Sequence, residues 1–282
     1  MSSYTCSSCG GVVATSRQAQ HEESWCSSIP DDVEVEAHQP NQHGLANTLQ
    51  DLNQSLHKIT NIELSSGLKL SFEEISVWSS GTSTGGALWK SELLLAEWVI
   101  RRSLSPSDIV LELGCGACPA AGMTASAMGC TAIMSDVANV VSLAETNLKR
   151  NALNVTKARN SQINRNNYDT LIFDWGSDKI PARLSSLSTP ISVILIGDCI
   201  FNDSTHVILL KTITQLNATF VSAKIILAFQ RRGTVEADFF ALAKEEYDFQ
   251  TAAVEDVEGL KAKLDSNTSA HLGLEICELI KV

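Results

Sequence analysis

The stretch Ile109-Val-Leu-Glu-Leu-Gly-Cys-Gly116 decides the fold of this chain of 282 residues. Its apolar residues surround a single acid, Glu112, a pattern typical of a strand buried in a parallel sheet. Gly114 and Gly116 follow one residue apart, and because glycine lacks a Cβ the backbone can approach a ligand closely there. We therefore expect a turn whose bare amides, from Gly114 through Cys115 to Gly116, contact a bound molecule.

A second short apolar run, Thr131-Ala-Ile-Met-Ser-Asp136, follows about twenty residues later and also ends in an acid. A carboxylate at the end of a neighbouring strand can accept hydrogen bonds from both hydroxyls of a ribose. The two runs together predict a nucleoside-binding α/β domain.

Strand patterns alternate with helical patterns along the rest of the chain. We expect strands at 108–113, 131–135, 158–163, 191–196, 224–229, 248–254 and 272–281, and helices at 91–103, 119–128, 139–152, 204–217 and 234–246. This alternation predicts an α/β fold with a doubly wound, mostly parallel sheet of seven strands. No helix of clear periodicity separates the last two strands, which indicates an antiparallel edge strand. Before the sheet, the runs 59–64 and 68–72 flank Ser65-Ser-Gly67, which predicts a β-hairpin extension.

Composition restricts the partners of the chain. A net charge of −11 argues against general binding to nucleic acid or to an anionic membrane, since both need a basic surface. No apolar run reaches the roughly 18 residues that span a bilayer, and the N-terminus lacks a signal-peptide pattern. We expect a monomer that is cytoplasmic or nuclear and keeps its eight cysteines mostly as thiols.

Residues 1–55 differ from the rest, being rich in Ser, Gln, His and acids and poor in large apolar residues. Such a segment cannot bury enough surface to fold alone, so we expect a disordered tail without metal, followed by a folded domain at 56–282. Cys6-x-x-Cys9, with His21 and Cys26 after it, approaches the spacing of a Cys-Cys-His-Cys zinc finger. A zinc site is therefore the alternative for this segment.

Pro119, three residues after Gly116, helps to decide which nucleoside the turn can bind. A dinucleotide-binding loop reads Gly-x-Gly-x-x-Gly, and this chain carries Pro119 at the third position. Proline suits a first helical turn but does not supply the close approach of a pyrophosphate site. Acid-Leu-Gly-x-Gly after a strand instead resembles the first motif of methyltransferases that use S-adenosylmethionine (AdoMet). Glu112 and the turn amides would hold the amino-acid end of that ligand, and Asp136 its ribose.

Three further motifs lie around the first in a characteristic order: Gly86-Ala-Leu-Trp89-Lys-Ser-Glu92, Phe173-Asp-Trp175-Gly176 and Gly197-Asp198-Cys-Ile-Phe201. With a later Arg232-Gly-Thr-Val-Glu236-Ala-Asp-Phe239-Phe240, they resemble the seven-β-strand protein lysine methyltransferases of the methyltransferase-like group, which modify non-histone proteins. The resemblance covers roughly residues 60–282. It implies the Rossmann-like fold of class I methyltransferases, AdoMet as cofactor and a protein as substrate.

The same resemblance implies roles for individual residues. Trp89 would lie over the cofactor, Trp175 would bracket its adenine, and Gly197 would border it. Asp198 would attract the ammonium group of an acceptor lysine and then orient the neutral amine. Phe201 would offer that group an aromatic face.

Two positions depart from the family pattern, since Cys118 replaces a glycine and Phe201 replaces a tyrosine. They keep two alternatives open. One is methyl transfer to another acceptor, such as a histidine, arginine or terminal amine of a protein, or a small molecule. The other is an AdoMet-binding module without turnover. An NAD-dependent oxidoreductase is disfavoured by Pro119.

Overall fold

The computed structural model describes the backbone of residues 3–5 and 12–14, and residues 57–75, 83–102, 104–158, 167–262, 264 and 273–282. The chain divides into two compact units, Met1–Gln50 and Asp51–Val282.

The smaller unit contains two short strands, β1 (Ser3–Thr5) and β2 (Val12–Ala14). They pair antiparallel, with Tyr4 opposite Val13. The rest of the predicted disordered tail, with all four candidate zinc ligands, lies outside the described residues.

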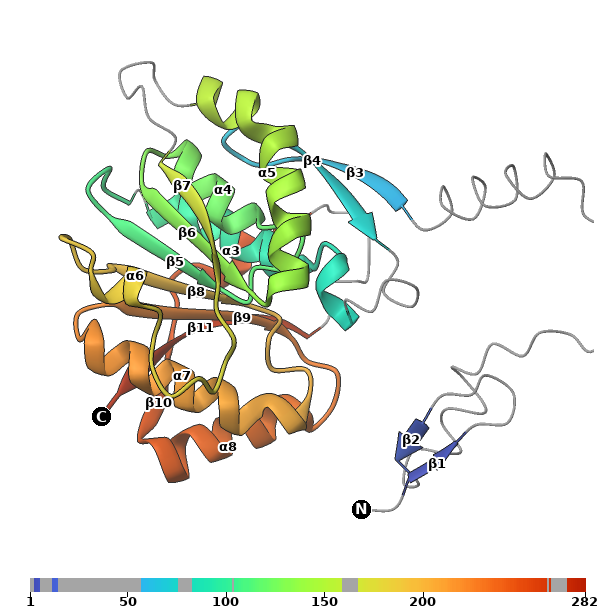
Figure 1. Ribbon diagram of the computed structural model, residues 1–282, viewed down its shortest axis with the longest axis vertical. Coiled ribbons are helices and arrows are strands. Elements are labelled where there is room, and N and C mark those ends of the chain that lie inside the picture. Colours follow the sequence, from blue (N-terminus) through green and yellow to red (C-terminus); the bar gives the residue numbers. More distant parts are fainter. Residues whose placement is uncertain are drawn as a thin grey trace, which may run out of the picture. The chain divides into compact units, whose positions relative to one another are not determined.

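A seven-stranded sheet ordered β10-β11-β9-β8-β5-β6-β7 forms the larger unit (Figure 1). Its strands are β5 (Ile109–Leu113), β6 (Thr131–Asp136), β7 (Tyr168–Ile172), β8 (Val193–Gly197), β9 (Lys224–Gln230), β10 (Phe249–Ala253) and β11 (Leu274–Lys281). β11 runs antiparallel to both of its neighbours, β9 and β10, while β5 to β9 pair in parallel. The predicted doubly wound, mostly parallel sheet is therefore confirmed, with its antiparallel strand one place in from the edge.

Helices cover both faces of this sheet. Their bounds are α3 (Lys90–Arg102), α4 (Ala120–Ala127), α5 (Ala138–Ala158), α6 (Ala182–Ser185), α7 (His206–Thr219), α8 (Val235–Tyr247) and α9 (Val257–Lys261), with 3-10 turns η2 (Ser83–Gly86) and η3 (Asp203–Thr205). Figure 1 shows α3, α4 and α5 on one face and α7 and α8 on the other. Among the helices that the structure describes, none combines the length and apolar character needed to cross a bilayer.

The order of the strands fixes where a ligand can bind. The chain passes from β5 to β6 on one side and later returns to β8 on the other side of β5. Connections therefore diverge at the carboxyl end of β5 and leave a crevice there, the position at which doubly wound sheets bind ligands.

The predicted hairpin is confirmed as β3 (His57–Glu63) and β4 (Lys69–Ile75). Asparagines of α5 attach it to the sheet domain. The Asn151 side chain accepts from Ser71 N–H and donates to Ser71 O, both at 2.8 Å, and Asn147 repeats this with Glu73 at 2.7 and 3.0 Å. Each asparagine thereby satisfies the main chain at the edge of β4 as a neighbouring strand would.

We expect Asn151→Ala to lower the free energy of unfolding by about 2 kcal/mol, because Asn151 is buried and its loss leaves Ser71 N–H and C=O without partners. Asn154→Ala is the matched control, since Asn154 makes one exposed hydrogen bond to the hairpin, to Lys69 O. It should cost less than about 1 kcal/mol. Urea denaturation of both variants measures the difference, and equal losses would contradict the attachment.

One predicted strand was misplaced. Residues predicted as a strand at 158–163 begin inside α5, which ends at Ala158, while 159–163 lie outside the described residues. The third strand of the parallel order is β7, at 168–172. The buried face of α5 continues past the predicted end at 152 to Val155. The buried residue before Val155 on this face is Asn151, whose polar side chain interrupts the hydrophobic pattern.

Candidate functional site

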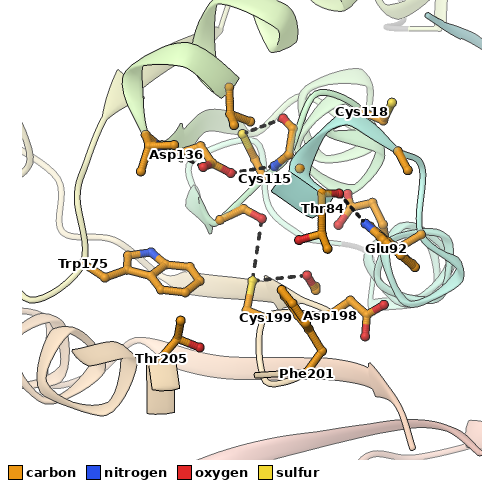
Figure 2. Close-up of a pocket in the computed structure, with 18 residues that line it drawn as sticks. Thr84, Glu92, Cys115, Cys118, Asp136, Trp175, Asp198, Cys199, Phe201 and Thr205 are labelled. Carbon is orange, nitrogen blue, oxygen red and sulfur yellow. Dashed lines mark hydrogen bonds between the residues drawn. The ribbon is translucent and has the colours of Figure 1, made fainter. Parts of the chain in front are cut away.

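The carboxyl ends of β5, β6 and β8 border a cavity of about 200 Å³ (Figure 2). Its lining comes from the loop before α3, the turn after β5, and the segments that follow β6, β7 and β8. These residues are Thr84, Gly85, Ala87, Trp89, Glu92, Gly114, Cys115, Gly116, Cys118, Asp136, Val137, Val140, Trp175, Gly197, Asp198, Cys199, Phe201 and Thr205.

The turn after β5 uses its own amides. The N–H groups of residues 114–117 donate to the Ser135 carbonyl, the Asp136 carboxylate and the Gly85 carbonyl, at N···O distances of 2.7–3.0 Å. The bare amides predicted to contact a ligand are therefore engaged inside the protein. The turn offers a ligand its glycine surface and fixes the Asp136 side chain beside it.

Both glycines of the turn have left-handed backbones, with φ of +72° at Gly114 and +62° at Gly116. A Cβ on Gly114 would lie 2.6 Å from Trp175 Cζ2 and 2.7 Å from Cys199 Sγ. A Cβ on Gly116 would lie 3.2 Å from Gly85 O. The turn therefore requires glycine for its conformation and, at Gly114, also for space.

Asp136 lies at the end of β6, where it was predicted to bind a ribose. Its Oδ2 accepts from Gly116 N–H at 2.9 Å and its Oδ1 from Val137 N–H at 2.8 Å. Burial raises the pKa of Asp136, and the two N–H donors act against that rise. Each oxygen keeps lone pairs for a further donor, so the carboxylate is positioned to accept from a pair of hydroxyls.

Trp175 borders the cavity from the loop after β7. Gly176 N–H donates to Thr212 Oγ1 of α7 at 2.9 Å, which ties this loop to the sheet domain. Figure 2 shows the Trp175 indole reaching toward Cys199, below Asp136. The ring is thus a flat wall next to the predicted ribose site, as a base-stacking residue requires.

Of the two glutamates near the turn, Glu112 was predicted to hold the ligand, but Glu92 is the one that lines the cavity. Glu112 is buried and does not line the cavity: its Oε2 accepts from Gly122 N–H at 2.7 Å, and its Oε1 has no hydrogen-bond partner in the described part of the chain. Glu92 lines the cavity from α3, with Oε1 accepting from Ala121 N–H at 2.6 Å. A Cβ on Gly197 would lie 2.6 Å from Glu92 Oε2.

The protonation of this pair follows from its burial. Burial raises the pKa of Glu92 to about 7, against three hydrogen bonds that lower it. Burial, and then the charge of Glu92, raise the pKa of Glu112 well above its ordinary value. Both shifts favour the protonated form, and Glu92 is the one of the pair that lines the cavity, where a ligand ammonium would meet it.

We expect the buried Glu92 to make the protein less stable as pH rises. Its folded pKa of about 7 lies above the ordinary 4.5, so between these values the native state holds a proton that the unfolded chain has lost. The cost is absent below about pH 4.5 and complete above about pH 7, on the order of 3 kcal/mol.

Chemical denaturation of the wild type and Glu92→Gln at pH 4.5, 6 and 8 measures this cost. The difference in unfolding free energy should shift in favour of Glu92→Gln as pH rises. A difference that is constant with pH would show that Glu92 carries no such proton.

Asp198 follows β8 with a left-handed backbone, φ +54°. Its side chain is only 4% exposed and forms a bidentate ion pair with Arg232: Nη1 to Oδ1 at 2.8 Å and Nη2 to Oδ2 at 2.5 Å. Gln230 N–H also donates to Oδ1, at 3.3 Å. The acid predicted to meet an acceptor amine is thus already paired with a cation.

Two aromatic rings border the cavity on this side. The Arg232 guanidinium lies 5.3 Å from the centre of the Trp89 ring, whose Nε1 donates to Thr84 O at 3.1 Å. Phe201 is 37% exposed and lines the cavity beyond Asp198. In Figure 2, Asp198 and Phe201 lie at the opposite end of the cavity from Asp136.

Three cysteines of the lining are free thiols: Cys115, Cys118 and Cys199. Burial raises the pKa of each well above the ordinary value. They are therefore neutral packing groups, and Cys118 occupies its place in the turn with its side chain buried.

The structure brings almost all predicted site residues into one cavity. The residues that line it together are Trp89, Gly114, Cys115, Gly116, Asp136, Trp175, Gly197, Asp198 and Phe201. Glu112 lies behind the lining, and the sequence assigned no role to Glu92 or Arg232. Glu92 and Arg232 each lie in a motif that resembles the family, and this was the available sequence signal. Only the fold shows that Glu92, and not Glu112, lines the cavity.

A close approach of helix to strand was not expected at Pro119. It occurs three residues later, at Gly122, where α4 packs on β5 and β6. A Cβ on Gly122 of α4 would lie 2.5 Å from Glu112 Oε2 and 2.6 Å from Met134 Cγ. Pro119 immediately precedes α4, as its missing N–H allows. Helix α4 therefore packs closely on β5 and β6 without a glycine at position 119.

Comparisons with known proteins bear on both units of the chain. The lysine methyltransferase family model matches residues 67–246, and the C2HC zinc finger model matches residues 1–27. No curated protein matches the chain.

Solved structures similar to the chain include two methyltransferases. The magnesium protoporphyrin IX methyltransferase of Synechocystis PCC 6803, with bound AdoMet, shares 16% identity over 68% of this chain and 79% of its own, with a TM-score of 0.41. The 16S rRNA N2 G1207 methyltransferase of T. thermophilus, in complex with AdoMet and guanosine, shares 15% over 80% of this chain, with a TM-score of 0.44. This chain spans 51% of that second protein.

Proposed function

The chain belongs to the lysine methyltransferase family, and from this premise we propose that it transfers the methyl group of AdoMet to a lysine side chain of a non-histone protein. One observation carries the proposal. A single cavity has Asp136, an acid fit for ribose hydroxyls, at one end and Asp198 with Phe201, fit for an amine, at the other.

The residues of the cavity fit AdoMet. Asp136 would accept from the ribose hydroxyls, Trp175 would contact the adenine, and Glu92 would meet the ammonium of the methionine end. That ammonium favours the ionised form of Glu92, because an opposite charge lowers the pKa of a carboxyl group. When bound, AdoMet supplies a methyl carbon: the acceptor lone pair forms the new C–N bond while the C–S bond breaks, its electron pair stays on sulfur, and the surplus proton leaves to water.

The acceptor end is suited to an amine. Trp89 and Phe201 offer aromatic faces, and Asp198 offers a carboxylate that is almost inaccessible to water. A lysine in water has a pKa of about 10.4 and must lose a proton before it can attack. A narrow, apolar approach favours the neutral amine by desolvation, and Asp198 can then accept a hydrogen bond from its N–H.

Calorimetry with S-adenosylhomocysteine (AdoHcy) and with NADH tests the cofactor. AdoHcy should bind to the native protein and NADH should not. No heat with AdoHcy would contradict the proposed function at its first step.

Methyl-labelled AdoMet with a cell extract then tests the acceptor, followed by acid hydrolysis of the labelled proteins. The expected label is in methyl-lysine, and Asp136→Ala is the control that should label nothing above background. Label in methyl-histidine or methyl-arginine would establish a protein methyltransferase with a different acceptor. Absence of label beside normal AdoHcy binding would favour a module without turnover.

For the smaller unit we propose a zinc site formed by Cys6, Cys9, His21 and Cys26. Its support is the spacing of these residues, the match of residues 1–27 to the C2HC zinc finger model, and the pairing of β1 with β2, the strands on either side of Cys6-x-x-Cys9 in the sequence. Elemental analysis of the purified full chain should find about one zinc per chain, and Cys26→Ser should lose it. A wild-type chain without zinc would leave the tail interpretation standing.

We further propose that the protein acts in the cytoplasm or nucleus and recognises its substrate as a monomer. The net charge of −11 suits a basic protein substrate. Fractionation of cells and light scattering of the purified chain test these two statements separately.

A further inference from the structure

Arg232 is held in place by more than Asp198. It lies in the loop between β9 and α8, where its N–H donates to Glu236 Oε2 at 3.2 Å and its Nη1 also donates to Gln230 O at 3.2 Å. Glu236 is fully buried. The guanidinium also lies over the Trp89 ring. These contacts hold the partly exposed arginine behind Asp198 and Trp89, which line the cavity.

The charge at the acceptor end follows from this pairing. A lone Asp198 carboxylate would favour a bound ammonium and so hold an acceptor lysine in its unreactive, protonated form. The bidentate guanidinium cancels that charge, because Arg remains a cation at any working pH. The hydrogen bond to Asp198 raises the pKa of Arg232 further.

We propose that Arg232, clamped on Asp198 against the face of Trp89, neutralises the acceptor end of the cavity so that it binds the uncharged amine and rejects the ammonium. The inference rests on the proposed function and deepens it by assigning a specificity-determining residue. The acceptor ammonium gives its proton to water before it enters, and the amine that enters keeps the lone pair that forms the C–N bond. Asp198 keeps free lone pairs with which to orient that amine.

Other charged groups face this end and must be separated in a test. Glu236 approaches Arg232 from α8, Glu92 lines the cavity from α3, and Arg231 forms an exposed ion pair with Glu275 of β11. Glu92 titrates near neutral pH. If two ligands differ only at the acceptor end, the titration of Glu92 contributes equally to both and drops out of the difference between them.

Sinefungin and AdoHcy are such a pair, because sinefungin carries an amine on the carbon that replaces sulfur, and the two share every other part. Calorimetry of both ligands at pH 7.5, in buffers of different ionisation enthalpy, counts the protons released on binding. For wild type, sinefungin should release about one proton more than AdoHcy, since its amine must bind uncharged. Its affinity relative to AdoHcy should rise with pH up to the pKa of the free amine.

Arg232→Met removes the charge and keeps an unbranched side chain. It should abolish the extra proton release and strengthen sinefungin binding relative to AdoHcy by about tenfold at pH 7.5. Arg232→Lys keeps a cation and should restore part of the proton release. Arg231→Met is the matched control and should behave as wild type, because Arg231 pairs with Glu275, which does not line the cavity, whereas Arg232 pairs with Asp198, which does.

Several results would overturn the inference. Arg232→Met with wild-type proton release would do so, as would weaker sinefungin binding without any change in release, which is the signature of a purely structural role. Asp198→Asn gives a second, independent variant: it leaves Arg232 uncompensated, so sinefungin should weaken relative to AdoHcy and still release its proton. Failure of AdoHcy to bind the wild type would instead refute the proposed function.

Discussion

Gly114→Ala is expected to remove AdoHcy binding and to destabilise the protein by about 3–5 kcal/mol. A Cβ at this position would enter a left-handed backbone and overlap both Trp175 and Cys199. Relief requires Trp175 to move, and Trp175 is the wall that the adenine is proposed to contact. An affinity loss of at least a hundredfold, about 2.7 kcal/mol, should appear in calorimetry.

Gly67→Ala separates the two causes. Gly67 also has a left-handed backbone, φ +81°, but a Cβ there meets nothing within 4 Å. It should therefore show the backbone strain alone, about 1–2 kcal/mol, with unchanged AdoHcy affinity. If both variants lose the same stability in urea denaturation, the crowding at Gly114 has no energetic consequence and the close packing of Trp175 on the turn is refuted.

Asp198→Asn is expected to reduce methyl transfer by about a hundredfold or more while AdoHcy affinity changes little. The carboxylate contacts the acceptor end of the cavity and not the ribose end, so cofactor binding should survive. Asparagine also tolerates the left-handed backbone of Asp198, whereas alanine adds strain there. The amide still offers one acceptor oxygen but leaves the Arg232 cation uncompensated beside the acceptor.

The comparison is made by methyl transfer to extract proteins at saturating AdoMet. Asp248→Asn is the matched control, because Asp248 has the same backbone conformation, φ +51°, is exposed, and lies at the C-terminal end of α8. It should transfer as wild type. Equal losses in the two variants, or loss of AdoHcy binding in Asp198→Asn, would remove Asp198 from the acceptor end.

The sheet, and the glycines and acid at the ends of β5 and β6, could be predicted from the sequence because they depend on local patterns. Apolar runs predict buried strands, and residues that follow parallel strands meet at one edge of the sheet. This reasoning placed Asp136 beside the glycine turn, while the resemblance to the lysine methyltransferases added Trp175 and Asp198 to the same site. The same reasoning assigned the turn amides to a ligand, since it could not know that Ser135, Asp136 and Gly85 accept from them.

The features that the sequence did not predict depend on contacts between residues far apart in the chain. Glu92 and Glu112 are equally acidic in the sequence, and only the packing of α3 against the end of β8 decides which one lines the cavity. The Asp198–Arg232 pair joins residues 34 positions apart and reverses the electrostatic expectation for the acceptor. The length of α5 was underestimated because its buried face includes Asn147 and Asn151, whose polar side chains pair with backbone.

Asn147 and Asn151 of α5 restrict which positions of this protein can change during evolution. They bind main-chain atoms of β4, so substitutions at Ser71 and Glu73 leave those bonds intact, while nothing in β4 can compensate for a change at Asn147 or Asn151. Asn147 also donates to Ala117 O at 2.8 Å, so the same side chain holds the turn beside the cavity. We therefore expect related sequences to keep asparagine at positions 147 and 151, while the side chains of β4 vary.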